Sequence, residues 1–230
     1  MAKILFGAGV GDARGSVGAM TFSKGRSGAV LRQKVSPVQP RSAHVLTIRS
    51  LFATLSKRWA HTLTDAQRAG WIALASTTAL TNTFGNTYHP TGLQLYQSCN
   101  RNLQLLGAPT IADAPANLDV TSLLTITPTA AKTGQTFAIA YTATPVPGTH
   151  DICFDASPQL NKGRAFTGSA MKFVNSFGPG SASPADIAAR YIALYGALQA
   201  GQKITVRAWA INETNGAAST PLVSTITVGA

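Results

Sequence analysis

The feature that most constrains the fold of this chain is a change of hydrophobic period around residues 108–118. Before this segment, apolar residues recur at steps of three and four, as on one face of an amphipathic helix. After it, apolar residues alternate with small or polar ones, as in half-buried strands. The segment itself is rich in proline and alanine. We therefore predict that 108–118 is a linker between a helical part and a β-rich part.

The part before the linker, residues 36–107, is predicted to be a small helical module. Two prolines precede a helix over about 43–60, and five apolar residues of that helix fall on one face. They are Val45, Ile48, Phe52, Leu55 and Trp59. Capping boxes of the form Thr-x-x-Gln begin a second helix at Thr64 and a third at Thr91. Gly107 ends the third helix, because glycine readily adopts the conformation that follows a helix.

Residues 1–35 are predicted to form a basic arm with one β-hairpin. The arm holds seven glycines, and extended runs at 19–23 and 29–35 flank a turn at 24–28. A lone hairpin is not stable in water, so we expect it to dock on the rest of the chain, on a sister subunit or on a partner. The candidate partner-binding residues are Phe22, Lys24, Arg26, Arg32 and Lys34.

Residues 119–230 are predicted to form an antiparallel β-sandwich-like domain with one inserted helix. Short alternating runs are separated by proline and glycine, in a pattern close to that of a fibronectin type III module. Ser183-Pro184-x-Asp186 is typical of a helix start and predicts a helix over about 184–198. The predicted fold class is therefore α+β in several parts: a β-hairpin arm, a small helical module and a sandwich-like domain.

The positive charge of the chain is concentrated near its N-terminus. The formal net charge is +11, and residues 1–68 hold eleven Lys and Arg against Asp12 and Asp65. Such a field attracts an acidic protein, nucleic acid or anionic lipid. Single-strand binding usually adds stacking aromatic residues, and Phe22 is the one aromatic residue of the hairpin. We therefore favour protein docking, with nucleic acid as the less favoured partner. No apolar run is long enough to predict a membrane span.

No pattern in the sequence predicts an enzyme, a cofactor or a metal site. The four histidines are scattered, and a Gly-x-Ser-x-Gly nucleophile motif is missing. Asp151 and Asp155 are four residues apart in a predicted strand, about 13 Å, which is too far for most acid–base pairs. We expect both carboxylates on a solvated surface. Cys99 and Cys153 are predicted to be buried free thiols, in a protein made in a cytoplasm.

Residues 15–100 resemble a group of phage and prophage proteins that are structural or uncharacterised. The resemblance consists of a glycine-rich hairpin that bears lysine, a proline break and a helical hairpin rich in tryptophan. The matching positions are Gly15-Ser-Val17-Gly18, Lys24-Gly25, Leu31-Arg32, Pro37, Pro40, Arg49-x-x-Phe52, Trp59, Leu63-Thr64-x-x-Gln67-Arg68-x-x-Trp71, Ala75, Phe84-Gly85, Thr91-Gly92, Tyr96 and Asn100. The resemblance covers well under half of the chain.

This resemblance implies a structural role in a tailed-bacteriophage virion. We expect an accessory subunit made in the cytoplasm of the bacterial host, and we favour a tail or head–tail appendage such as a fibre or fibre-attachment protein. Its expected partners are tail, portal-adaptor or capsid subunits, together with copies of itself. The alternatives are a capsid decoration protein and, in another class, a basic DNA-binding protein inside the virion.

Overall fold

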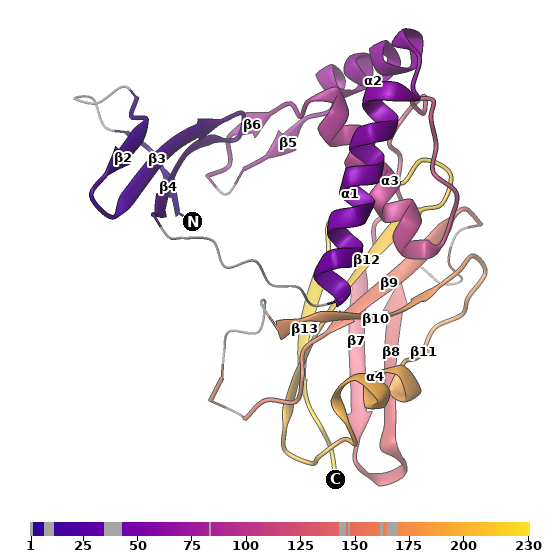
Figure 1. The fold of residues 1–230 in the computed structure, drawn as a ribbon. Helices are drawn as coiled ribbons and strands as arrows, with labels where there is room; N and C mark the ends of the chain where they lie inside the picture. The colour runs from indigo at the N-terminus through magenta and orange to yellow at the C-terminus, as the bar shows by residue number, and fades with distance from the viewer. Residues whose placement is uncertain are drawn as a thin grey trace. The chain divides into compact units, whose positions relative to one another are not determined.

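The structure is a computed structural model that describes residues 2–6, 12–34, 43–82, 84–142, 146, 148–161, 163–164 and 170–230. Its helices and antiparallel sheets confirm the predicted α+β fold in several parts (Figure 1). The chain divides into two compact units. Unit 1 comprises Met1–Ser98 and Ile111–Ala116, and unit 2 comprises Cys99–Thr110 and Asn117–Ala230.

The N-terminal arm forms an antiparallel sheet of four strands, which we call the arm sheet. The predicted hairpin is present as β3 (Met20–Gly25) and β4 (Gly28–Gln33), with Arg26 and Ser27 at its turn. Two short strands, β1 (Ala2–Ile4) and β2 (Gly15–Val17), extend it in the order β1-β4-β3-β2. The sequence did not predict these edge strands, because runs of three residues next to glycine carry little alternation.

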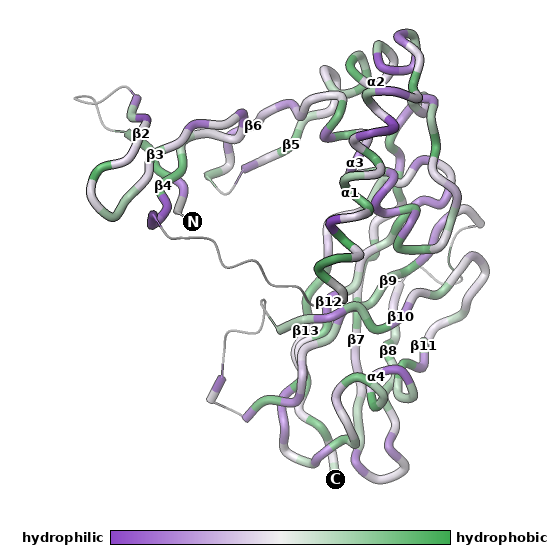
Figure 2. The backbone as a smooth tube through the Cα atoms, viewed as in Figure 1, coloured by the Kyte–Doolittle hydropathy of each residue, from purple (hydrophilic) through white to green (hydrophobic). Residues whose placement is uncertain are grey.

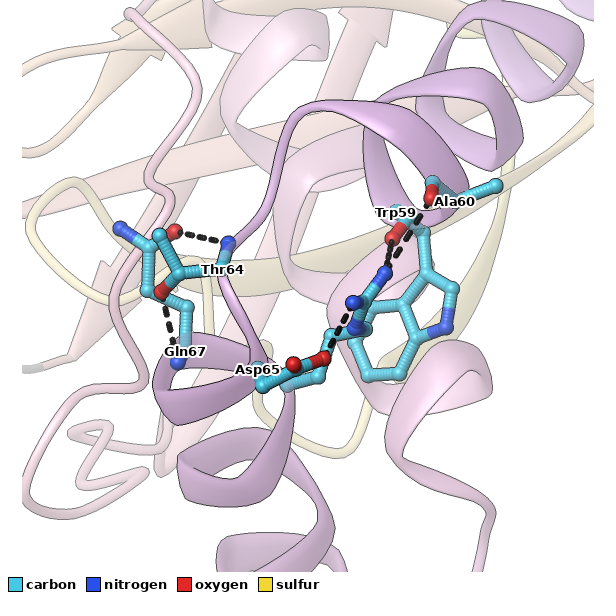
Figure 3. Close-up of polar contacts among 6 residues, drawn as sticks. Trp59, Ala60, Thr64, Asp65 and Gln67 are labelled. Carbon is cyan, nitrogen blue, oxygen red and sulfur yellow. Dashed lines mark hydrogen bonds and ion pairs between the residues drawn. The ribbon is translucent and has the colours of Figure 1, made fainter.

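Three helices follow where the sequence predicts them. They are α1 (Ala43–His61), α2 (Asp65–Thr77) and α3 (Gly92–Leu106), and the strands β5 (Leu80–Thr81) and β6 (Thr87–Tyr88) lie between α2 and α3. Both capping boxes are formed. At the start of α2, the backbone N–H of Gln67 donates to Thr64 Oγ1 over 3.2 Å, and the backbone N–H of Thr64 donates to Gln67 Oε1 over 2.9 Å (Figure 3).

Aromatic side chains make the core of unit 1. Trp71 and Tyr96 are fully buried and meet edge to face, with ring centroids 5.5 Å apart, and the Trp59 ring also contacts Tyr96 with the same centroid distance. The buried indole N–H of Trp71 needs an acceptor, and it donates to the Ala112 carbonyl over 2.8 Å. Part of the segment predicted as a linker, Ile111–Ala116, is therefore packed in unit 1.

Unit 2 is built on two antiparallel sheets with a shared core. One sheet has the order β10-β9-β12-β13 and the other β11-β8-β7. The strands are β7 (Thr125–Ala131), β8 (Thr136–Thr142), β9 (His150–Ala156), β10 (Lys172–Phe177), β11 (Ala185–Asp186), β12 (Lys203–Asn212) and β13 (Leu222–Thr227). The predicted alternation is confirmed, since Phe137, Ile139 and Tyr141 are all buried in this core. Figure 2 shows the hydropathy along these strands.

The inserted helix of unit 2 is present but shorter than predicted. It is α4 (Ala188–Tyr195), whereas the sequence predicts a helix over about 184–198. Ala185 and Asp186 pair with β8, and the Ile187 amide donates to the Phe137 carbonyl, so these residues belong to the sheet. Strand pairing here prevails over a local helix-start signal.

The C-terminal half of α3 belongs to unit 2. Leu103 is fully buried, and the Asn102 side-chain amide donates to the Gly216 carbonyl over 2.9 Å. The sequence predicts that a helical module at 36–107 and a sandwich-like domain at 119–230 fold independently. This independence stays a prediction. Because the C-terminal half of α3 packs in unit 2, a fragment that starts near Asn117 lacks part of that unit.

We expect a fragment 91–230 to be more stable than a fragment 117–230 by about 2–4 kcal/mol. The shorter fragment loses a buried leucine and leaves the Gly216 carbonyl without its partner. Urea unfolding followed by circular dichroism measures the difference. Equal free energies of unfolding would mean that α3 contributes nothing to unit 2.

Candidate functional site

The arm sheet has one apolar face and one polar face. Successive residues of a strand point to opposite faces, and Met20 pairs with Val17 while Phe22 pairs with Leu31. These four side chains therefore share a face, while Thr21 and the other odd-numbered residues of β3 point to the opposite one. Val17 is 72% exposed and Met20 51% exposed, whereas Phe22 and Leu31 are half-buried, so the described part of the chain leaves the part of this apolar face around Val17 and Met20 uncovered.

The arm sheet also carries an excess of basic residues. The described arm residues hold six Lys and Arg, whereas Asp12 is the one acid among them. Asp12 forms exposed ion pairs with Lys24 and Arg14, at 3.3 and 3.6 Å. Arg32 and Lys34 are exposed and have no ion-pair partner among the residues that the structure describes. The sheet thus combines uncovered apolar surface with excess positive charge, a combination that suits an acidic protein surface.

Arg26 is placed differently from the other four predicted residues. Its guanidinium donates to the His89 and Pro90 carbonyls, over 3.2 and 3.1 Å, and the Asn82 side-chain amide donates to the Ser27 carbonyl next to it. The turn of the arm hairpin is therefore bound within unit 1. The structure brings Phe22 and Lys24 to the apolar face, puts Arg32 on the opposite face, and gives Arg26 an internal contact.

The expectation that Asp151 and Asp155 are solvated is wrong. Each residue is only 6% exposed, and all seven residues of β9, the strand between β10 and β12, are buried. Asp155 is ion-paired with Arg207. Sequence reasoning missed this because a strand covered on both faces cannot be recognised from its acids alone.

The two cysteines are free and buried, as predicted. Cys99 lies in α3 and Cys153 in β9. Burial raises the pKa of the Cys99 thiol to about 12, and burial also raises the pKa of Cys153. Both residues are therefore held as thiols at neutral pH, the form that is a poor nucleophile.

Two titratable side chains at the start of β9 have shifted pKa values. Burial, with a further contribution from the nearby Glu213 carboxyl, raises the pKa of Asp151 from 3.8 to about 7. Burial lowers the pKa of His150, whose Nε2 accepts a hydrogen bond from the Thr121 amide over 3.1 Å. At neutral pH His150 is therefore neutral, and Asp151 titrates near neutrality.

These shifts predict that the folded protein loses stability as the pH rises from about 4 to about 7. Over this range the folded state still holds the Asp151 proton, whereas the unfolded carboxyl is already ionised, and the loss levels off once the folded carboxyl ionises too; about 1 kcal/mol of it falls above pH 6.5. His150 acts at lower pH, where its protonation destabilises the folded state. We expect Asp151→Asn to remove the loss with rising pH in thermal unfolding, while Asp119→Asn, at an exposed side chain, retains it. An unchanged pH slope in Asp151→Asn would contradict this assignment.

The described residues hold no group of three or more His, Cys, Asp or Glu side chains that could bind a metal ion. Among them, no helix has the length and hydropathy that crossing a bilayer requires. Neither a protein-family model nor a curated protein matches the sequence of this chain.

Proposed function

We propose that this protein is an accessory structural subunit of a tailed-bacteriophage virion and not an enzyme. Its place is a tail or head–tail appendage, as a fibre or fibre-attachment protein, and the arm sheet anchors it to a neighbouring tail, portal-adaptor or capsid subunit. In this proposal the protein is made in the host cytoplasm and is present in the particle in several copies.

The observation that carries the proposal is the uncovered apolar face of the arm sheet. A sheet of four short strands needs its apolar face packed to be stable, and Val17 and Met20 are exposed in the described chain. Contiguous exposed apolar surface with a polar surround is typical of a protein–protein interface. An assembly role explains both the exposed apolar surface of the arm and its excess of basic residues, whereas an enzyme would require neither.

The two-part architecture supports the same proposal. Unit 2 has a sheet of three strands and a sheet of four strands around one core, an arrangement that agrees with a fibronectin type III-like module. Together with the resemblance at residues 15–100, this favours an anchor joined to a module that packs on or projects from the particle. A capsid decoration protein would use the same two parts.

The experiment is to locate the protein on purified particles of the phage or prophage that encodes it. An antibody against unit 2 should label the tail or neck in electron micrographs, whereas uniform labelling of the head would favour capsid decoration. Absence of the protein from purified particles would overturn the proposal. Tight DNA binding by the purified chain, with a steep salt dependence, would favour the internal DNA-binding role instead.

A further inference from the structure

Unit 2 holds a cavity of about 230 Å³ on the outer face of its larger sheet. Phe173 of β10 pairs with Asp155 of β9, and Asp155 pairs with Arg207 of β12. These three residues form a row across the sheet, and all three line the cavity. Trp209, two residues along β12 on the same face, also lines it, as does Arg101 of α3.

The charges at this cavity do not balance. Arg207 is ion-paired with the buried Asp155 through NH2, and its guanidinium carbon lies 5.4 Å from the centre of the Trp209 ring. Its Nε is buried and has no hydrogen-bond partner among the described residues. Arg101 is exposed and brings a second guanidinium, whose NH1 donates to Asn102 Oδ1 over 3.3 Å. Two guanidinium groups against one carboxylate leave one excess positive charge.

We propose that this cavity binds a small monocarboxylate that carries one ring, either a sugar acid or an aromatic acid. A guanidinium presents paired N–H donors whose geometry matches a carboxylate. The single excess charge is balanced by a carboxylate monoanion, whereas the dianion of a phosphate monoester would exceed it. The Trp209 and Phe173 rings offer flat apolar surfaces on which a ring can pack. The volume is below the ~300–1,000 Å³ of most ligand pockets, so one ring fits and a longer chain does not.

The proposal is independent of the role of the arm sheet. Its test uses the full chain and isothermal titration with glucuronate and benzoate, each beside its neutral counterpart, glucose and benzyl alcohol. We expect at least one acid to bind about tenfold more tightly than its neutral counterpart, because charge-assisted hydrogen bonds are lost with the carboxylate. The acid that binds identifies the ligand as a sugar acid or an aromatic acid. Binding should also change tryptophan fluorescence, since Trp209 is the one tryptophan of unit 2.

Two variants and one control decide whether binding occurs at this cavity. Arg101→Ala removes an exposed side chain, and Arg207→Lys keeps the charge beside Asp155 but loses the paired donors. Each should weaken binding of the acid about tenfold. Arg190→Ala, at an exposed position of α4 that does not line the cavity, should bind as the wild type does. If neither acid binds, or if all three variants bind alike, the proposal is wrong.

Discussion

Replacing Gly216 with alanine is expected to destabilise unit 2 by about 3 kcal/mol or more. A Cβ at this position would lie 2.3 Å from the Cys99 carbonyl oxygen and 2.7 Å from its carbon, in the backbone of α3. The backbone of Gly216 also has a φ of +71°, which alanine adopts only with strain. Neither the helix backbone nor the turn can yield easily, so the clash and the strain add.

Gly201→Ala is the matched control for this substitution. Gly201 also has a positive φ, +79°, but a Cβ there would meet no atom within 4 Å. Its replacement should therefore cost only the strain, about 1 kcal/mol. Urea unfolding of both variants measures the two losses. Equal losses would show that the close approach of Gly216 to α3 contributes nothing to stability.

The helices could be predicted closely because their signals are local. Thr64 with Gln67, and Thr91 with Gln94, form the reciprocal hydrogen bonds that the capping-box sequences predict. The hairpin of the arm is likewise predicted from the two extended runs and the glycine-containing turn between them. In each of these cases the residues that determine the element are within a few positions of one another.

The features that could not be predicted depend on contacts between distant parts of the chain. The surroundings of the Asp151 carboxyl come from distant residues such as Gly178 and Glu213, and nothing near residue 151 reports that. The helix-start signal at Asp186 failed because β8, more than forty residues earlier, pairs with it. The cavity in unit 2 combines residues that range from Arg101 to Pro221 along the chain. Local patterns carry no information on such juxtapositions.

Four of the five candidate partner-binding residues are basic, whereas the structure shows an apolar face on the same sheet. Lys24 and Phe22 are on this face, whereas Val17 and Met20, also on it, are not among the candidate partner-binding residues that the sequence indicates. Arg26, which was singled out, contacts the His89 and Pro90 carbonyls of its own unit. Charge reversal at Arg26 would therefore disturb unit 1 itself, and Arg32 is the better position for testing electrostatic attraction.

Deletion of residues 1–35 is expected to leave a soluble, folded protein that fails to join the particle. The arm sheet contributes no residue to the buried aromatic core of unit 1, which lies in the helices. Ordering a segment with seven glycines costs conformational entropy, and packing of its apolar face on a partner would offset that cost. We expect incorporation to fall by more than about tenfold, since docking without the apolar face loses well over 1.4 kcal/mol.

A sharper test of the docking role compares two substitutions by glutamate on β3, which add the same charge to opposite faces of the arm sheet. Met20→Glu puts a carboxylate on the apolar face, whereas Ser23→Glu puts one on the polar face. Circular dichroism should show both variants folded, because both side chains are exposed. The decisive measurement is the amount of each variant in purified particles, by quantitative immunoblot against a major virion protein. We predict near wild-type incorporation of Ser23→Glu and a severe loss for Met20→Glu, and full incorporation of Met20→Glu would contradict the docking role of the apolar face.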